Sequence, residues 1–271
     1  MQEKPVAVIS GGSSGIGLEI ARQLAARGYR LLLVARDESR LAAAATSIGA
    51  PSCVMTCALD VADEAACAQV IARAVRELGR LDWLITSAGI AEPGAFTELD
   101  SAAHRRQMEI NYFGSLNLVR PAAAFMADRG GGRITLVSSA AAFVGIAGYS
   151  AYAPGKFAVR GLGEALRAEL LGAGITVSVA FPPDTNTPQY AQEQATKPDF
   201  TKRITAGGGV LNAQTVARSI IAGAEAGRFM LTPGWLMSLY GWAHSLYAPF
   251  FLRKQSRIVV QCMREKKTAE Q

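Results

Sequence analysis

The sequence contains little cysteine and almost no histidine, and this scarcity excludes several kinds of site. Among 271 residues there are four cysteines and two histidines. The cysteines form no C-x-x-C pair, so neither a zinc site nor any other metal site is expected. They are instead expected to be free thiols in a reducing compartment. Their positions are Cys53, Cys57, Cys67 and Cys262.

Signals for secretion and for nucleic-acid binding are missing as well. The first residues lead directly into a strand-like run, without the basic and then apolar layout of a signal peptide. The formal charge is +6, and residues 253–271 hold six Lys or Arg against two Glu. No zinc-finger spacing or aromatic RNA-binding motif accompanies this charge, so nucleic acid is not an expected partner.

Short apolar runs rich in β-branched residues alternate with segments whose apolar residues recur three and four apart. Half of the residues are apolar, which is enough for a sizeable core. Strands that alternate with helices indicate βαβ units and a mainly parallel sheet. The sequence therefore predicts one α/β domain over residues 1–234 and an apolar extension over residues 235–271. The predicted strands are residues 6–10, 30–35, 52–57, 81–86, 133–138 and 175–180.

Glycines follow the first predicted strand directly, in the stretch SGGSSGIG of residues 10–17. Glycine allows a sharp turn and lets a ligand approach the backbone without a Cβ in the way. The helix that follows presents free N–H groups and the positive end of its dipole to a phosphate. This context predicts a dinucleotide site. The predicted ligands in this loop are Gly11, Ser13, Ser14, Gly15, Ile16 and Gly17.

The spacing of these glycines resembles the T-G-x-x-x-G-x-G loop of the short-chain dehydrogenase/reductase family. Ser10 stands where the family usually has Thr and keeps the hydroxyl. The stretch LDV then places Asp60 and Val61 where the family contacts adenine. After the fourth predicted strand, TSAG replaces the usual N-N-A-G and removes two amide side chains. Only backbone contacts at Ala88 and Gly89 are therefore carried over from the family.

The resemblance covers residues 5–235 and implies a single Rossmann-type fold. In this fold a doubly wound parallel sheet of about seven strands is flanked by helices. The ligand then lies beyond the carboxyl ends of the strands, where the connections diverge to opposite faces.

The end of the second predicted strand indicates which dinucleotide binds. An acidic residue at this point holds the ribose 2′-hydroxyl in NAD-specific folds. Here Arg36 occupies the position, and its planar guanidinium suits the 2′-phosphate of NADP(H). Arg40 lies one helical turn further and adds positive charge, whereas Asp37 would favour NAD. We expect NADP(H); without such a ligand, Arg36 would be an ordinary surface cation.

A tyrosine and a lysine four residues apart suggest proton transfer. Tyr152 and Lys156 project from one face if they lie on a helix. The ammonium is expected to lower the pKa of the phenol toward working pH. Pro154, inside the motif, is tolerated only in the first turn, so the helix is predicted to start here. Tyr149 is a rival phenol but has no lysine four residues on.

Two further residues complete a set that the resemblance implies is catalytic. Ser139 lies thirteen residues before Tyr152, the offset of the catalytic serine of the family. Its hydroxyl would hydrogen-bond the substrate carbonyl, and Ser138 would point the other way. Asn111, in NYFG, matches the family's N-x-x-G, whose Asn backbone holds a water leading to Lys156. The resemblance thus implies a carbonyl reductase or alcohol dehydrogenase in which Tyr152 transfers the proton.

The loop FPPDTNTPQY, residues 181–190, narrows the substrate. Pro182 and Thr187 fit the family pattern P-G-x-x-x-T, and Pro183 replaces its glycine. Both Thr185 and Thr187 are predicted to hydrogen-bond the cofactor. The loop and the downstream EQATKP resemble the 3-ketodihydrosphingosine reductase group of the family. That resemblance implies reduction, by NADPH, of the 3-keto group of a long-chain sphingoid base in sphingolipid biosynthesis. The alternatives are another hydrophobic ketone or alcohol (steroid, 3-ketoacyl or retinoid) and a non-catalytic NADP-binding scaffold.

Residues 235–252 are nearly all apolar, aromatic or small, and Arg253 and Lys254 follow at once. A spanning helix needs about 20 apolar residues, and this run is shorter and contains Pro249. We expect an interfacial helix or reentrant anchor that contacts the membrane surface, on its cytoplasmic side, through residues 235–258. A lid over the substrate pocket, an oligomer contact and a true span are the alternatives. The resemblance also implies a homodimer or tetramer formed through the helices that carry the catalytic residues.

Overall fold

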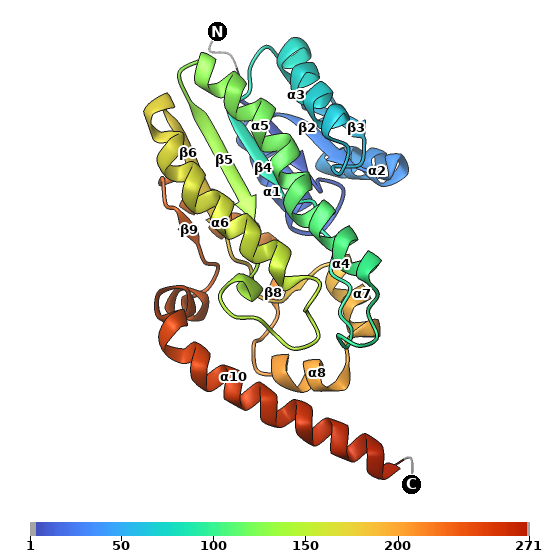
Figure 1. The fold of residues 1–271 in the computed structure, drawn as a ribbon. Helices are drawn as coiled ribbons and strands as arrows, with labels where there is room; N and C mark the ends of the chain where they lie inside the picture. Colours follow the sequence, from blue (N-terminus) through green and yellow to red (C-terminus); the bar gives the residue numbers. More distant parts are fainter. Residues whose placement is uncertain (1–3, 270–271) are drawn as a thin grey trace.

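A parallel sheet of seven strands forms the centre of the computed structural model, which describes residues 4–269 (Figure 1). The strand order is β3-β2-β1-β4-β5-β6-β9, and all neighbouring strands are parallel. The predicted doubly wound sheet is therefore confirmed. The six predicted strands agree with the structure to within two residues, and the two-residue β9 was not predicted. The strands are β1 Val6–Ser10, β2 Arg30–Ala35, β3 Val54–Ala58, β4 Trp83–Thr86, β5 Gly132–Val137, β6 Ile175–Ala180 and β9 Met230–Leu231.

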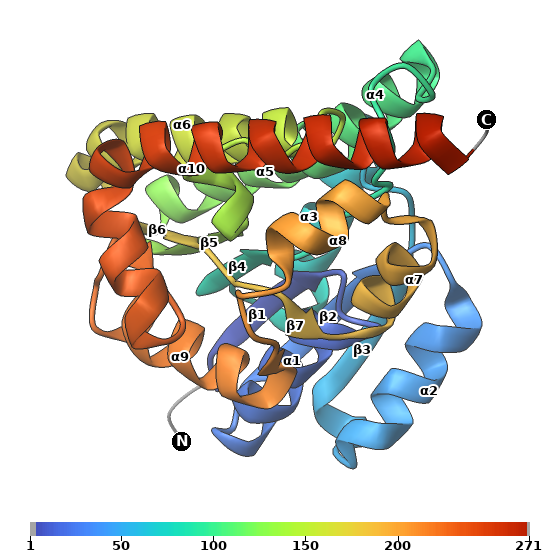
Figure 2. The ribbon, with the colours of Figure 1, turned by 90° about the horizontal axis from the view of Figure 1, so that it is seen from below.

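Helices cover both faces of the sheet, with α3, α5 and α6 on one face and α1, α2 and α9 on the other (Figures 1 and 2). Alternate residues of β1 belong to two separate apolar cores: Val6 and Val8 pack on one face, Ala7 and Ile9 on the other. This explains why the central strands are continuous apolar runs. The helices are α1 Gly15–Ala26, α2 Glu38–Ile48, α3 Glu64–Leu78, α4 Ser101–Met108, α5 Gly114–Asp128, α6 Ala153–Glu169, α7 Pro188–Thr196, α8 Asp199–Thr205, α9 Ala213–Glu225 and α10 Trp235–Ala269.

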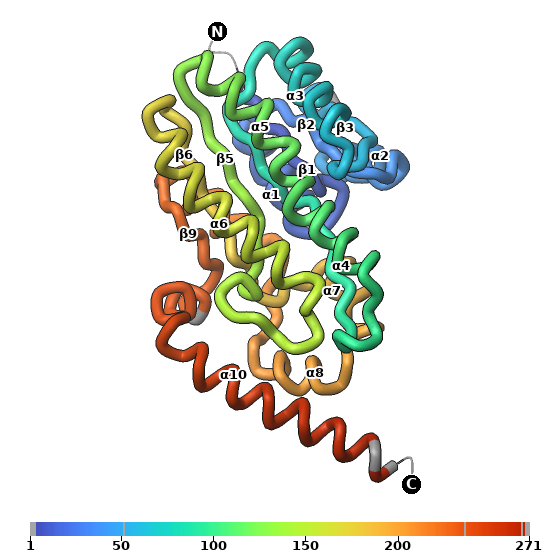
Figure 3. The backbone as a smooth tube through the Cα atoms, viewed as in Figure 1, coloured from blue at the N-terminus to red at the C-terminus, as the bar shows by residue number. Residues whose placement is uncertain are grey.

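The chain after β6 builds a cap beyond the carboxyl ends of the strands. A small parallel pair, β7 (Thr185–Asn186) and β8 (Leu211–Asn212), encloses the segment that carries α7 and α8. Figure 3 shows this segment below the sheet, and α10 beneath it. The described chain therefore starts at the amino-end side of the sheet and finishes at the opposite end of the molecule.

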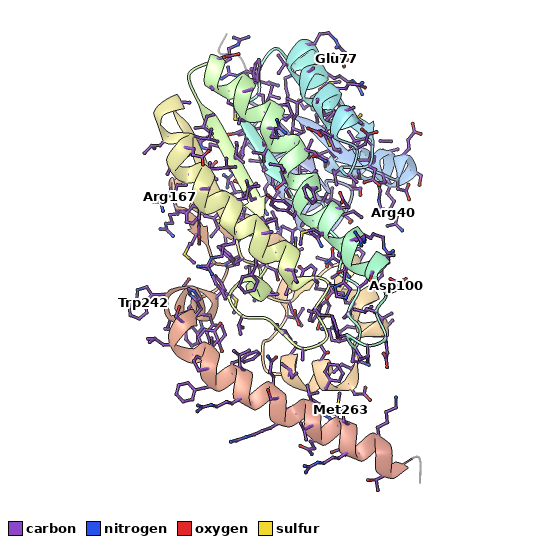
Figure 4. The ribbon with its side chains drawn as sticks, viewed as in Figure 1. Arg40, Glu77, Asp100, Arg167, Trp242 and Met263 are labelled. Atoms are coloured by element: carbon purple, nitrogen blue, oxygen red, sulfur yellow. The ribbon has the colours of Figure 1, made fainter. Side chains whose placement is uncertain are left out.

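The last helix, α10, changes direction along its length. Trp242 lies on the arm before the bend and Met263 on the arm after it, and Pro249 lies between them (Figure 4). Proline removes a helical hydrogen bond and clashes with the preceding turn, which accounts for a kink. In the described part of the chain, no helix is both long enough and apolar enough to cross a membrane.

The second arm of α10 packs against α8 and supports a loop of the catalytic region. The Gln255 side chain accepts a hydrogen bond from Ala147 N at 3.1 Å and donates one to Gly145 O at 3.2 Å. Arg203 of α8 forms an ion pair with Glu265 at 2.7 Å. The extension is thus tied to the domain by polar contacts at two places.

Candidate active site

A cavity of about 520 Å³ opens beyond the carboxyl ends of the strands. It lies at the switch in strand order next to β1, which is where open α/β sheets bind ligands. Most residues predicted from the sequence line it. They are Gly11, Ser13, Ser14, Gly15, Ile16, Arg36, Arg40, Asp60, Val61, Ala88, Gly89, Ser139, Tyr152, Lys156, Pro182, Thr185 and Thr187. The predicted residues Gly17 and Asn111 lie behind this wall.

The glycine loop turns where only glycine fits. Gly11 has φ +68°, and a Cβ there would lie 2.7 Å from Ala88 N. A Cβ on Gly17 would lie 2.4 Å from Gly11 O, so Gly17 supports the loop from behind. Helix α1 begins without a side-chain cap and without an acidic residue in its first turn. Its first N–H groups therefore stay available to an anion.

The loop after β4 is fixed to the glycine loop by a hydroxyl. Ser10 Oγ accepts a hydrogen bond from Ala88 N at 3.2 Å, which shows why a hydroxyl residue suits this position. Ser87 lines the cavity where the family usually has an amide. The backbone of Ala88 and Gly89 thus faces the cavity without amide side chains beside it.

The charged residues after β2 differ in what they already bind. Arg36 is exposed, lines the cavity and forms no ion pair within the described residues. Asp37 caps α2 by accepting from Arg40 N at 3.0 Å and from Ser39 Oγ at 2.7 Å. Arg40 also pairs with Asp37 at 3.3 Å and projects from α2 at the edge of the molecule (Figure 4). Because the Asp37 carboxylate caps α2 and pairs with Arg40, the Arg36 guanidinium beside it stays available to an anion.

The paired Tyr152 and Lys156 stand at the start of α6, as predicted. Tyr152 is the residue before the first turn, and Pro154 lies within that turn. The Lys156 ammonium is buried, 5.6 Å from the centre of the Tyr152 ring, and donates to Val137 O at 3.1 Å. Burial lowers the pKa of Lys156 to about 8. Ser138 also lines the cavity, although it was expected to point the other way, and its hydroxyl donates to Lys156 O at 2.8 Å.

The expected downward shift of the Tyr152 pKa is wrong for this structure. Burial raises the pKa of Tyr152, and the negative charges of Glu193 and Asp184 raise it further. The Ser139 hydroxyl lowers this pKa, by less than burial or Glu193 raises it. The desolvation that a cavity wall imposes on a phenolate thus outweighs the other effects. Tyr152 consequently keeps its proton, which suits a proton donor.

Asn111 lies in a π-helical turn, Glu109–Phe113, between α4 and α5. Its side chain donates to Ile90 O at 2.9 Å and accepts from Ile90 N at 3.0 Å. A Cβ on Gly89 would lie 2.7 Å from Asn111 Oδ1. Single π turns recur at functional sites, and this one fixes the loop after β4 against the helices.

The loop after β6 satisfies much of its own hydrogen bonding. Thr185 Oγ1 donates to Pro183 O at 2.8 Å, and Thr187 Oγ1 caps α7 by accepting from Tyr190 N at 3.1 Å. A Cβ on Gly15 would lie 3.1 Å from Thr187 Cγ2, so this loop touches the glycine loop. Thr187 retains its own proton for a ligand, whereas Thr185 has already donated its proton.

The sequence reasoning missed a group of residues beside Tyr152. Tyr149, set aside because it has no lysine four residues on, donates to Glu193 Oε2 at 2.8 Å. The Lys197 ammonium lies 5.6 Å from the centre of the Tyr149 ring. Asp184 lines the same end of the cavity. The sequence signals for this group were the loop FPPDTNTPQY, which supplies Asp184, and the EQATKP stretch, which supplies Glu193 and Lys197.

Comparison with known proteins finds relatives along most of the chain. Residues 5–198 match the family described as short chain dehydrogenase. The chain is 41% identical to the 3-dehydrosphinganine reductase of Danio rerio over 228 residues, which are 82% of this chain and 69% of that protein. It is 36% identical to the 3-ketodihydrosphingosine reductase of Dictyostelium discoideum, over 82% of this chain and 72% of that protein. A crystal structure of an actinorhodin polyketide ketoreductase with NADPH has a TM-score of 0.78 at 29% identity, covering 86% of this chain and 98% of that one.

Proposed function

The chain belongs to the short chain dehydrogenase family, and on that premise we propose that it reduces the 3-keto group of 3-ketodihydrosphingosine. The product is dihydrosphingosine, an intermediate of sphingolipid synthesis. The observation that carries the proposal is the joint placement of Ser139, Tyr152 and Lys156 on one cavity wall. Two relatives that are 36–41% identical over 82% of this chain bear the names of reductases of this substrate.

The cavity fits NADPH as the reductant. The uncapped start of α1 and the glycine loop suit the diphosphate, and Arg36 suits the 2′-phosphate. Asp60, Val61, Ala88 and Gly89 line the wall between them, where adenine and ribose would lie. NADPH, when bound, supplies the hydride for the carbonyl carbon.

The side chains of this chain supply the proton and hold the carbonyl. Tyr152, which retains its proton because its pKa is raised, donates that proton to the carbonyl oxygen. Ser139 donates a hydrogen bond to the same oxygen and stabilises its developing charge. Lys156, four residues from Tyr152 on α6, holds the nicotinamide ribose. Asn111 fixes the loop after β4, and its backbone would hold a water leading to Lys156, through which the proton of Tyr152 is restored.

NADPH oxidation with 3-ketodihydrosphingosine tests this proposal. We expect turnover with that substrate, and much lower turnover with a steroid, a retinoid or a 3-ketoacyl thioester at equal concentration. Activity restricted to one of those other carbonyl compounds would identify that compound, and not 3-ketodihydrosphingosine, as the substrate. Absence of turnover on every carbonyl, with NADPH still bound, would instead favour the scaffold alternative.

We also propose that α10 contacts a membrane surface on its cytoplasmic side. Trp235, Leu239, Trp242, Leu246 and Phe250 recur three or four residues apart, and each is 50–83% exposed. Such spacing places apolar side chains along one face of a helix. Exposed cations follow at Arg253, Lys254 and Arg257, where anionic headgroups would meet them. The free cysteines suit a reducing compartment.

Co-flotation with anionic vesicles tests the membrane contact. The triple change Trp242→Ser, Leu246→Ser and Phe250→Ser should abolish flotation, while turnover of a short, water-soluble amino ketone stays unchanged. Equal flotation of the triple variant and the unaltered chain would contradict the proposal. Among the described residues α10 does not line the cavity, but Gln255 supports the loop around Ile146, which does. A membrane-bound α10 would therefore place the cavity close to the lipid.

Exposed phenylalanines on the catalytic helices support a homodimer. Phe113 is the last residue of the π turn that carries Asn111, and Phe157 lies on α6 next to Lys156; they are 39% and 41% exposed. We propose that these helices form the contact between two copies. Sedimentation velocity should show a dimer that Phe113→Glu with Phe157→Glu converts to a monomer, and a monomeric unaltered chain would contradict this.

A further inference from the structure

The substrate end of the cavity holds charged side chains that the mechanism above does not use. Asp184 and Glu193 line the cavity. Lys197 lies over the rings of Tyr149 and Tyr190, with its ammonium 5.6 and 5.5 Å from their centres. Both rings also line the cavity. These residues come from the loop after β6, from α7 and from the segment before α6.

The two carboxylates are held differently. Glu193 is 8% exposed, and its oxygens accept hydrogen bonds from Tyr149 Oη at 2.8 Å and Gln189 Nε2 at 3.0 Å. The Asp184 carboxylate accepts no hydrogen bond within the described residues. Burial raises the pKa of both carboxyl groups. Glu193 is therefore a fixed acceptor, and Asp184 is an acceptor with its oxygens free.

The charges of this group do not balance. Lys197 is 3% exposed, and its ammonium has no hydrogen-bond partner among the described residues. Its charge lowers the pKa of both carboxyl groups, yet it forms an ion pair with neither. Another carboxylate that lines the cavity, Glu92, is paired with Arg106. Within the group of Asp184, Glu193 and Lys197, one negative charge thus has no cation of the group to compensate it where burial makes charge costly. Lys156, a buried cation on the cavity wall whose pKa Glu193 raises, donates to Val137 O rather than to a carboxylate.

The same charge opposes the reaction of a neutral ketone. Asp184 and Glu193 both raise the pKa of Tyr152, so they disfavour negative charge on its oxygen. A carbonyl oxygen that gains negative charge beside Tyr152 would be disfavoured in the same way. A cation on the carbon next to the carbonyl would offset this repulsion and fill the acceptors. The substrate that matches this end of the cavity is therefore an amino ketone in its protonated form.

We infer that Asp184 and Glu193 bind the protonated amine next to the reacting carbonyl and so select amino ketones over simple ketones. Glu193, fixed by Tyr149 and Gln189, orients one N–H of the ammonium, and Asp184 accepts another. Lys197 keeps the cluster from carrying two uncompensated charges. The inference rests on the proposed function, because 3-ketodihydrosphingosine carries an amine on the carbon next to its keto group.

The test compares two ketones on three full-length variants. The substrates are 3-ketodihydrosphingosine and a 1-hydroxy-3-ketone of the same length that lacks the amine. The variants are Glu193→Gln, Asp184→Asn and the control Glu98→Gln, which removes the same charge from an exposed position outside the cavity. Glutamine at 193 still accepts from Tyr149, so the fold is retained, and an unchanged melting temperature checks this.

We expect Glu193→Gln and Asp184→Asn each to lower kcat/KM for the amino ketone by about tenfold to hundredfold, mainly through KM. For the ketone without the amine, both should keep or raise kcat/KM, because a repelling charge is gone. If the two carboxylates had a purely structural role, their substitution would lower kcat/KM for both ketones together. Equal kcat/KM for the amino ketone in wild type and variants would overturn the inference. A wild type that does not reduce the amino ketone would instead overturn the proposed function.

Discussion

The two ends of the cavity hold their charges in opposite ways. At the cofactor end, Arg36 and Arg40 are exposed, and α1 begins with uncapped N–H groups. At the substrate end, Glu193 and Lys197 are buried, and they contact a phenol hydroxyl, an amide and aromatic rings. Charges in water are inexpensive to maintain, whereas buried charges cost folding free energy unless a partner compensates them. The cofactor end is thus a generic anion site, and the substrate end is built for a particular head group.

Tyr152 stands between the two ends, and its loss should have the largest effect. Tyr152→Phe removes the proton donor, so we expect kcat to fall by about 10²–10⁴-fold. The NADPH dissociation constant should change little, because the phenol hydroxyl is not needed for the phosphate contacts. Steady-state kinetics and calorimetric titration with NADPH measure the two quantities.

The matched control is Tyr149→Phe, which removes the second phenol of the same segment. Because Tyr149 binds Glu193 rather than the reacting oxygen, its loss should raise KM for the amino ketone and spare kcat. Near wild-type turnover in Tyr152→Phe, or equal kcat losses in both variants, would show that the two phenols are wrongly assigned.

The same contrast explains which parts of the molecule could be predicted from its sequence. The strands, the glycine loop and the start of α6 follow from local patterns, since Gly11 permits a left-handed turn and Pro154 restricts the backbone to the first turn of a helix. The charged cluster does not, because Tyr149 and Glu193 lie 44 residues apart and only the fold joins them. The direction of the Tyr152 pKa shift was missed for a related reason: burial is a property of the whole cavity wall.

Other misses have local physical causes. The strand β9 contains two residues, Met230–Leu231, too few for any periodicity to appear. The extension was expected from its composition, but its folding as one bent helix of 35 residues, Trp235–Ala269, was not. Its second arm, from Arg253 onward, is polar in sequence, and its contacts with Ala147 and Arg203 are long-range.

A smaller effect is expected at the cofactor end, where solvent screens the charges. Arg36→Ala should weaken NADPH binding by about tenfold to hundredfold, since a charge-assisted bond to the 2′-phosphate is lost. NADH binding should not change, because NADH has no 2′-phosphate. Arg40→Ala is the control: its guanidinium already pairs with Asp37, so its loss should cost less. Equal weakening of NADPH and NADH by Arg36→Ala would show that the arginine supports the loop rather than the phosphate.

The smallest effect is a pH dependence that comes from the buried amine between the two ends. Burial lowers the pKa of Lys156 to about 8, so the side chain is charged below this pH and neutral above it. Between about pH 7 and about pH 9 the charged fraction falls roughly tenfold. NADPH affinity should fall by up to the same factor, because the neutral amine loses its charge-assisted bonds to the ribose. The free energy of unfolding changes with the opposite sign. Above pH 8 the unfolded chain binds a proton that the folded chain lacks, so the cost of burying this charge is relieved as pH rises.

Lys156→Arg keeps its charge throughout this range and should bind NADPH with no such pH dependence. Calorimetric titration of both proteins across the range measures it, and parallel pH profiles would assign the titration to a group other than Lys156.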